Sequence, residues 1–137
     1  MGKELPHLKF YATRCTLLAV HALAWSFLWQ SVPEFRQTSQ LPDDVVDRRL
    51  KDVIITGSVF LALTAIMTLT GLTLHSISFH FLYIAFHSLG TFLTAVSILN
   101  YWDVSLLWIP CSITCIFPFV IELIYAILTC AGLNQHF

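Results

Sequence analysis

The sequence predicts an all-α membrane protein: four transmembrane helices in an antiparallel bundle, with one longer loop between the first and second helices. Of its 137 residues, 57% are hydrophobic and 11% are charged, and the mean hydropathy is +0.77. A soluble domain has about a quarter of its residues charged. All Lys and Arg residues lie at or before Lys51, and after Asp52 only Asp103 and Glu122 are charged. The chain therefore forms a single membrane domain, with spans expected at about residues 10–30, 53–74, 77–99 and 106–130.

The first span, residues 10–30, carries Arg14 near its start and His21 near its middle. It is long enough to cross a hydrocarbon core, which takes about 20 residues. Arg14 is shallow enough to extend its guanidinium to the lipid headgroups. Residues 22–24 (Ala-Leu-Ala) resemble a signal-peptidase site. The apolar run continues beyond them, so we expect an uncleaved span.

Residues 31–52 form the predicted loop, with Pro33 and Pro42 inside it. Within it, acidic side chains precede basic ones in residues 43–52. That order favours a short helix lying at the membrane surface. The loop would serve either as a docking surface for an extramembrane partner or as a solvated linker.

The second span, residues 53–74, has small side chains at helical spacing, which let helix backbones approach closely in lipid. They are Ser58, Ala62 and Ala65. The third span, residues 77–99, carries polar and small residues that we place on one face: His87, Ser88, Thr91 and Ala95.

The fourth span, residues 106–130, contains Pro110 and Pro118. Proline removes a backbone donor, so both should bend or loosen this helix. Four spans place both termini on one side of the membrane, and the Lys and Arg residues do not decide which side. The tryptophans cluster near the opposite, loop-bearing face and predict an aromatic belt there. They are Trp25, Trp29, Trp102 and Trp108.

Ionisable side chains lie at similar depths in three spans. A charge at the bilayer centre costs about 2.5–3.5 kcal/mol on insertion scales, so each needs a partner. Counting residues inward places His21, His87 and Glu122 at one level. We expect His87 and Glu122 to face each other with His21 nearby, and Arg14 to be within reach of Glu122.

This polar cluster has several interpretations. It could be interhelical packing, in which each hydrogen bond contributes about 0.6 kcal/mol. It could be an acid–base pair acting on a lipid, a proton or ion path, or part of a lipid or sterol pocket. Cys111 and Cys115 lie at a different depth from the histidines, so we expect no metal site. No cofactor or nucleic-acid-binding motif is evident.

The second half of the chain resembles the transmembrane protein 107 family in the spacing His-x14-Trp-x5-Trp-x9-Pro-x3-Glu. The residues that carry it are His87, Trp102, Trp108, Pro118 and Glu122. The resemblance covers most of the chain and is strongest over residues 84–128. The sequence departs from the family at Thr114-Cys115, where the family has Cys-Ser, and at residues 134–136, where a basic tail is common.

The resemblance implies a non-enzymatic scaffold at the ciliary transition zone, with cytosolic termini. It would help to assemble the Meckel-syndrome (MKS) complex with tectonics and B9-domain proteins, and would support cilium biogenesis and control of ciliary membrane composition. Its other partners would be membrane lipids, with an oligomer or hetero-complex left open. The alternative is an intramembrane lipid- or sterol-binding protein, or a lipid-modifying enzyme using Glu122 and His87.

Overall fold

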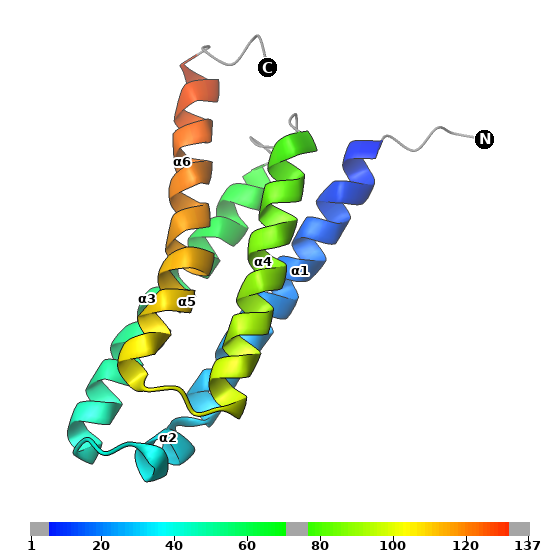
Figure 1. Ribbon diagram of the computed structural model, residues 1–137. Helices are drawn as coiled ribbons and strands as arrows, with labels where there is room; N and C mark the ends of the chain where they lie inside the picture. The colour runs from blue at the N-terminus through cyan, green and yellow to red at the C-terminus, as the bar shows by residue number, and fades with distance from the viewer. Residues whose placement is uncertain (1–5, 71–76, 132–137) are drawn as a thin grey trace.

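The computed structural model describes residues 6–70 and 77–131, and these are helical almost throughout, with no strand among them (Figure 1). The long helices are α1 (Pro6–Gln30), α3 (Asp43–Thr70), α4 (Ile77–Leu99) and α6 (Phe117–Cys130). They run alternately up and down, so that α1 begins and α6 ends at the same end of the bundle. The predicted all-α fold is confirmed.

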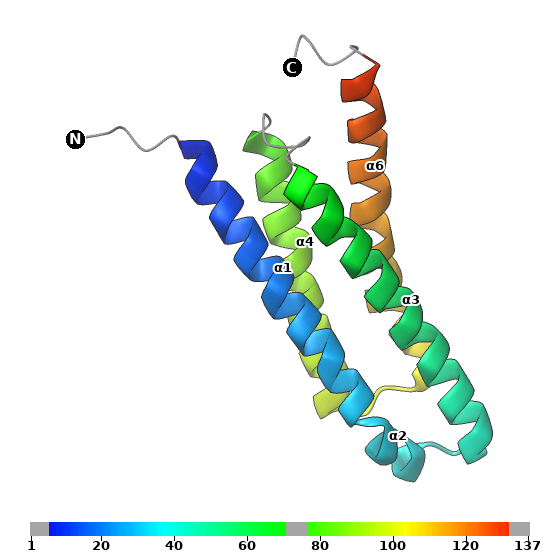
Figure 2. The same ribbon diagram turned by 180° about the vertical axis from the view of Figure 1, so that it is seen from behind.

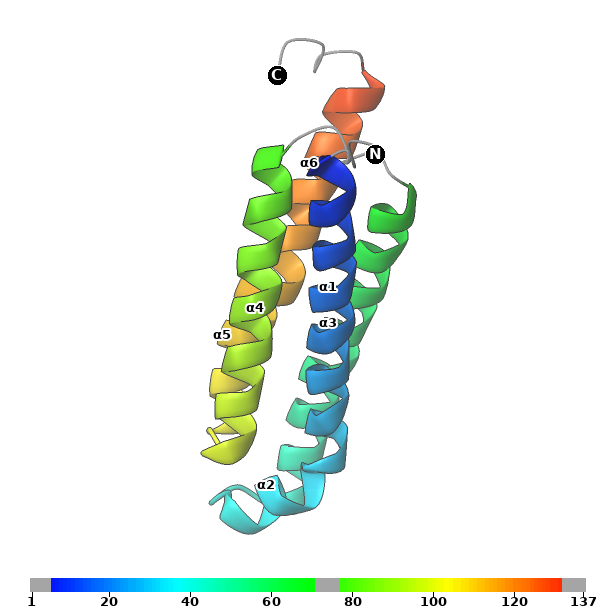
Figure 3. The same ribbon diagram turned by 90° about the vertical axis from the view of Figure 1, so that its right-hand side faces the viewer.

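The bundle is elongated, with α1 and α3 side by side on one face and α4 and α6 behind them (Figures 2 and 3). Helix α1 packs against both α3 and α4, and α3 packs against α6. Because α1 touches two other long helices, its side chains determine much of the interhelical packing.

Three helical segments are long and apolar enough to cross a membrane by themselves: Asp43–Thr70, Ser78–Leu99 and Val104–Cys130. The first helix qualifies only together with the short helix α2 (Val32–Thr38), from which it is bent by 55°. The chain thus has three spans, or four if this bent pair forms one, as expected of a multi-pass membrane protein.

The loop predicted at residues 31–52 is instead largely helical. Helix α2 occupies part of it, and α3 begins at Asp43 and continues unbroken into the membrane span. No separate surface helix is therefore formed over residues 43–52. The reason is that Val46, Leu50 and Val53 are buried at helical spacing, which keeps one face of α3 on the core before the span begins. Residues 71–74 of the predicted second span lie outside the described residues.

The fourth span is not one continuous α-helix. A 3₁₀ turn, η1 (Val104–Leu107), leads into α5 (Trp108–Cys111), and a π-helical turn, η2 (Ser112–Ile116), joins α5 to α6. At the end of η2, the Phe117 N–H donates to the Ser112 carbonyl, five residues back. Pro118, one residue further on, has no N–H to donate, so the loosening expected near the prolines takes the form of this π turn.

Candidate functional site

A buried ion pair joins α1 to α6. Arg14 Nη2 donates to Glu122 Oε1, and the same nitrogen donates to Thr68 Oγ1 of α3 at 2.7 Å. The Arg14 side chain is 1% exposed and the Glu122 side chain is fully buried. Arg14 therefore does not extend to the headgroups, and it links three helices.

Tyr83 adds the fourth long helix to this cluster. The Arg14 guanidinium carbon lies 3.9 Å from the centre of the Tyr83 ring, a cation–π contact. The Tyr83 hydroxyl donates to the Pro118 carbonyl at 2.8 Å, which ties α4 to the start of α6. Neither Tyr83 nor Thr68 was predicted from the sequence. The signal for Tyr83 was its position one helical turn before His87.

His21 of α1 and His87 of α4 form a second pair. Their Nδ1 atoms lie 3.2 Å apart, and both side chains are fully buried. For two neutral imidazoles this bond requires one Nδ1–H donor and one Nδ1 acceptor, so the two rings are opposite tautomers.

The predicted residues Arg14, His21, His87 and Glu122 thus come together, but as two pairs. His87 was expected opposite Glu122, whereas the structure joins His87 to His21; the expected reach of Arg14 to Glu122 is confirmed. A guanidinium keeps its charge in a buried site, so it is a better counterion for a carboxylate than an imidazole that can lose its proton.

Two glycines allow α1 to approach its neighbours closely. A Cβ on Gly90 of α4 would lie 2.3 Å from His21 Cε1, and one on Gly57 of α3 would lie 2.2 Å from Trp25 Cζ2. The Trp25 indole also donates to the Ile54 carbonyl at 3.1 Å. His21 and Trp25, one helical turn apart, therefore dock α1 onto α4 and α3, respectively.

Trp25 is 1% exposed and belongs to the core, not to the predicted aromatic belt. Trp29 and Trp108 are exposed, as residues that contact lipid would be, and Trp102 is half-buried.

Cys111 and Cys115 are both buried. Across residues 6–70 and 77–131, no group of three His, Cys, Asp or Glu side chains is placed to hold a metal ion.

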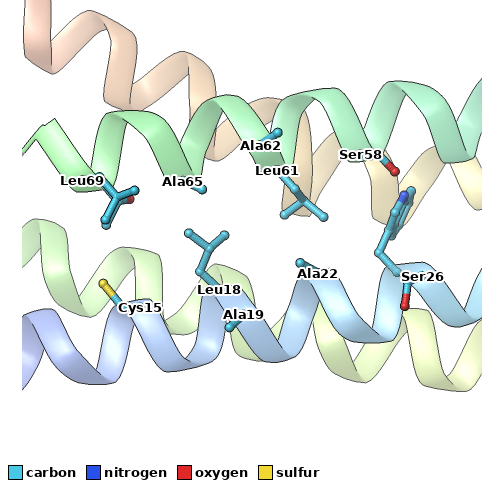
Figure 4. A pocket seen from close by; sticks show the side chains of 12 residues that line it. Cys15, Leu18, Ala19, Ala22, Ser26, Ser58, Leu61, Ala62, Ala65 and Leu69 are labelled. Atoms are coloured by element: carbon cyan, nitrogen blue, oxygen red, sulfur yellow. The ribbon is translucent and has the colours of Figure 1, made fainter.

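A groove of about 460 Å³ runs between α1 and α3 (Figure 4). Its walls are mostly apolar and small, with Ala19 and Ala22 on one side and Ala62 and Ala65 on the other. Thr68, which binds Arg14, lies at one end. Neither Glu122 nor His87 lines this groove, although the lipid-binding alternative requires a cavity beside them.

The family model TMEM107, described as a transmembrane protein, matches residues 8–126. That range includes every residue of the two buried pairs and both prolines of the fourth span. Neither the curated proteins nor the solved structures contain a match.

Proposed function

Because the chain belongs to the TMEM107 family of transmembrane proteins, we propose that it is a non-enzymatic membrane scaffold of the ciliary transition zone. In this role it helps to assemble the gate complex, and so supports cilium biogenesis and control of ciliary membrane composition. The family match over residues 8–126 carries the proposal, since it covers nearly all the described helices.

A scaffold in lipid needs a fixed shape, because partners recognise its outer faces by close packing. The pair of Arg14 and Glu122 supports this role: together with Thr68 and Tyr83 it connects α1, α3, α4 and α6 through buried contacts. With these ionisable groups buried inside, the outer faces of the helices are left to apolar side chains such as Leu69, Phe92 and Ile127. These faces would meet neighbouring membrane helices laterally.

The end of the bundle that carries α2 would provide the extramembrane contacts. Arg36 of α2 binds Asp47 of α3 through two hydrogen bonds, and Arg49 donates to Ser105 Oγ at 3.0 Å. These contacts connect α2, α3 and η1, which together form one surface. With cytosolic termini, this surface would face the ectodomains of tectonics, and the opposite end would face B9-domain proteins.

The test is the localisation of tagged variants in ciliated cells. Glu122→Gln and Glu122→Ala should lower the abundance of the protein or its concentration at the transition zone, while Asp44→Asn, which changes an exposed acid, should leave the abundance unchanged. Normal abundance and localisation of both Glu122 variants would count against a shape-dependent scaffold. A diffuse endoplasmic-reticulum pattern of the wild-type protein would refute the ciliary assignment itself.

A second candidate function, lipid or sterol binding, is favoured by the groove between α1 and α3. Its volume lies within the range of about 300–1,000 Å³ typical of ligand sites. Ala62→Leu should fill the groove and reduce crosslinking to a photoactivatable sterol, whereas Ile66→Leu on the exposed face should not. Equal crosslinking of all three proteins would exclude the groove. A lipid-modifying enzyme would also need Glu122 and His87 to share a cavity.

A further inference from the structure

A second cavity lies at the other end of the bundle from the ion pair. It is a cleft of about 360 Å³ between the segment that joins α2 to α3 and the segment that joins α4 to η1. Its lining combines aromatic, neutral polar and acidic side chains. The residues that matter here are Phe35, Gln40, Tyr101, Trp102 and Asp103.

Two aromatic residues of the lining are accessible: Tyr101 is 41% exposed and Trp102 is half-buried. Phe35 is buried behind them and packs edge-on against Tyr101, with ring centroids 5.9 Å apart at an angle of 79°. Tyr101 has a φ of 45°, a left-handed conformation that is disfavoured for a residue with a Cβ. Tyr101 takes this conformation two residues after the end of α4, and Trp102, which follows it, also lines the cleft.

Asp103 is the one charged side chain that lines the cleft. One of its carboxylate oxygens accepts a hydrogen bond from the Ser105 N–H at 2.8 Å, which fixes the carboxylate at the start of η1. The other lining residues are neutral, so the cleft has one negative charge next to the aromatic residues Tyr101 and Trp102. This combination attracts a cation with a weakly hydrated, apolar surface, and quaternary ammonium groups are the ligands that aromatic cages recognise.

From this lining we propose that the cleft binds the choline group of a phosphocholine lipid headgroup. The cleft begins two residues beyond the end of α4, where a membrane helix reaches the headgroup region. Arg49 bonds to Ser105, two residues from the carboxylate, and its guanidinium is suited to the phosphate of the same headgroup. The proposal does not depend on the scaffold function, because it concerns only the lining of this cleft.

The first experiment measures binding of soluble headgroups to the full-length protein in a choline-free maltoside detergent. Phosphocholine should bind saturably by calorimetry, and more tightly than phosphoethanolamine. Asp103→Asn should weaken phosphocholine binding about threefold or more, since it removes the charge but retains an oxygen for the Ser105 N–H. Trp102→Leu should weaken it similarly, and Trp108→Leu, which removes an exposed tryptophan outside the cleft, should not.

The second experiment separates a lipid headgroup from free choline. The protein is incorporated into nanodiscs of either phosphatidylcholine or phosphatidylglycerol, and a photoactivatable phosphatidylcholine is added to each. Crosslinks at residues 101–104 that soluble phosphocholine competes away would support the lipid headgroup. Binding of soluble choline without such crosslinks would overturn it. So would equal affinity for phosphoethanolamine, or an Asp103→Asn variant that binds phosphocholine as the wild type does.

Discussion

We predict that replacing Arg14 and replacing Glu122 change the free energy of unfolding by different amounts, because the two residues respond differently to the loss of the partner. Glu122→Gln leaves a guanidinium that cannot lose its proton in a site closed to water. Removing one member of a buried pair costs about 3–5 kcal/mol, and we expect a value in that range. Arg14→Met leaves a carboxyl group that can take up a proton, so its cost should be about 1–3 kcal/mol.

The double variant Arg14→Met/Glu122→Met removes both charges and fills the space with apolar atoms. Such replacements are often neutral or stabilising. The double variant should therefore be more stable than Glu122→Gln. With the single variant Glu122→Met closing the cycle, the coupling between the two positions should be about 3 kcal/mol or more. A cluster acting only through neutral interhelical hydrogen bonds would give about 0.6 kcal/mol.

The assay is reversible unfolding in mixed micelles by sodium dodecyl sulfate, followed by tryptophan fluorescence. The exposed pair Arg36–Asp47 serves as the matched control and should show a much smaller coupling, because water screens it. A coupling below about 1 kcal/mol for the buried pair would refute the reasoning. If Glu122→Gln costs less than Arg14→Met, the released guanidinium reaches the headgroups and the site is not closed as described.

Three further predictions concern single contacts. Gly90→Ala should destabilise the bundle by about 1–3 kcal/mol, because its Cβ meets the His21 ring, and His21→Ala should rescue it; an unchanged unfolding midpoint would refute the close approach. Thr68→Val should cost about 1 kcal/mol in the same assay, since it removes the hydroxyl bound to the buried guanidinium. The Arg36 hydrogen bond lowers the pKa of Asp47, so the stability it contributes is present above the ordinary carboxyl pKa of about 3.9 and is lost as pH falls below it. The stability difference between the wild type and Asp47→Asn should therefore shrink on acidification, as thermal unfolding at several pH values would show.

The membrane character of the helices and the ionisable residues that meet between them could be predicted from the sequence, because both follow from the cost of placing charge in hydrocarbon. Which of these residues pair with each other could not be predicted. Depth counting gives the level of Arg14, His21, His87 and Glu122, but not the rotation of each helix about its axis. The rotations depend on the glycine contacts, which bring α1 against α4 at His21 and against α3 at Trp25.

The face chosen for the third span shows the same difficulty. The predicted face contained Ser88, Thr91 and Ala95, which are exposed or half-buried in the structure. The buried face of α4 contains His87 but continues in steps of three and four residues through polar side chains and glycine. These are His80, Tyr83, His87, Gly90, Thr94 and Ser97. Following that spacing, instead of the i and i+4 positions from His87 alone, would have identified the buried face of α4 from the sequence.

In the region between the first two spans, the prediction failed because helices were expected to be a loop. Its polar composition suggested a loop, yet Phe35, Val46 and Leu50 are fully buried or nearly so. These apolar residues lie among charged ones, so the helical pattern of apolar residues is weak in the sequence. Pairing of Arg36 with Asp47 across α2 and α3 is a tertiary contact, and a single sequence does not reveal it.

Helix α1 explains why the polar residues lie inside the bundle. Its buried positions form one stripe in steps of three and four: Arg14, Leu18, His21, Trp25 and Leu28. In lipid, apolar side chains give helices little reason to associate, so polar contacts and close backbone approach must supply the specificity. The three polar or amphipathic members of this stripe supply it, since together they bind all three neighbouring long helices: Arg14 binds α6 and α3, His21 binds α4, and Trp25 binds α3. The polar and amphipathic residues of α1 are thus the ones that fix its position, and the same contacts leave its outer face free for lipid or a partner helix.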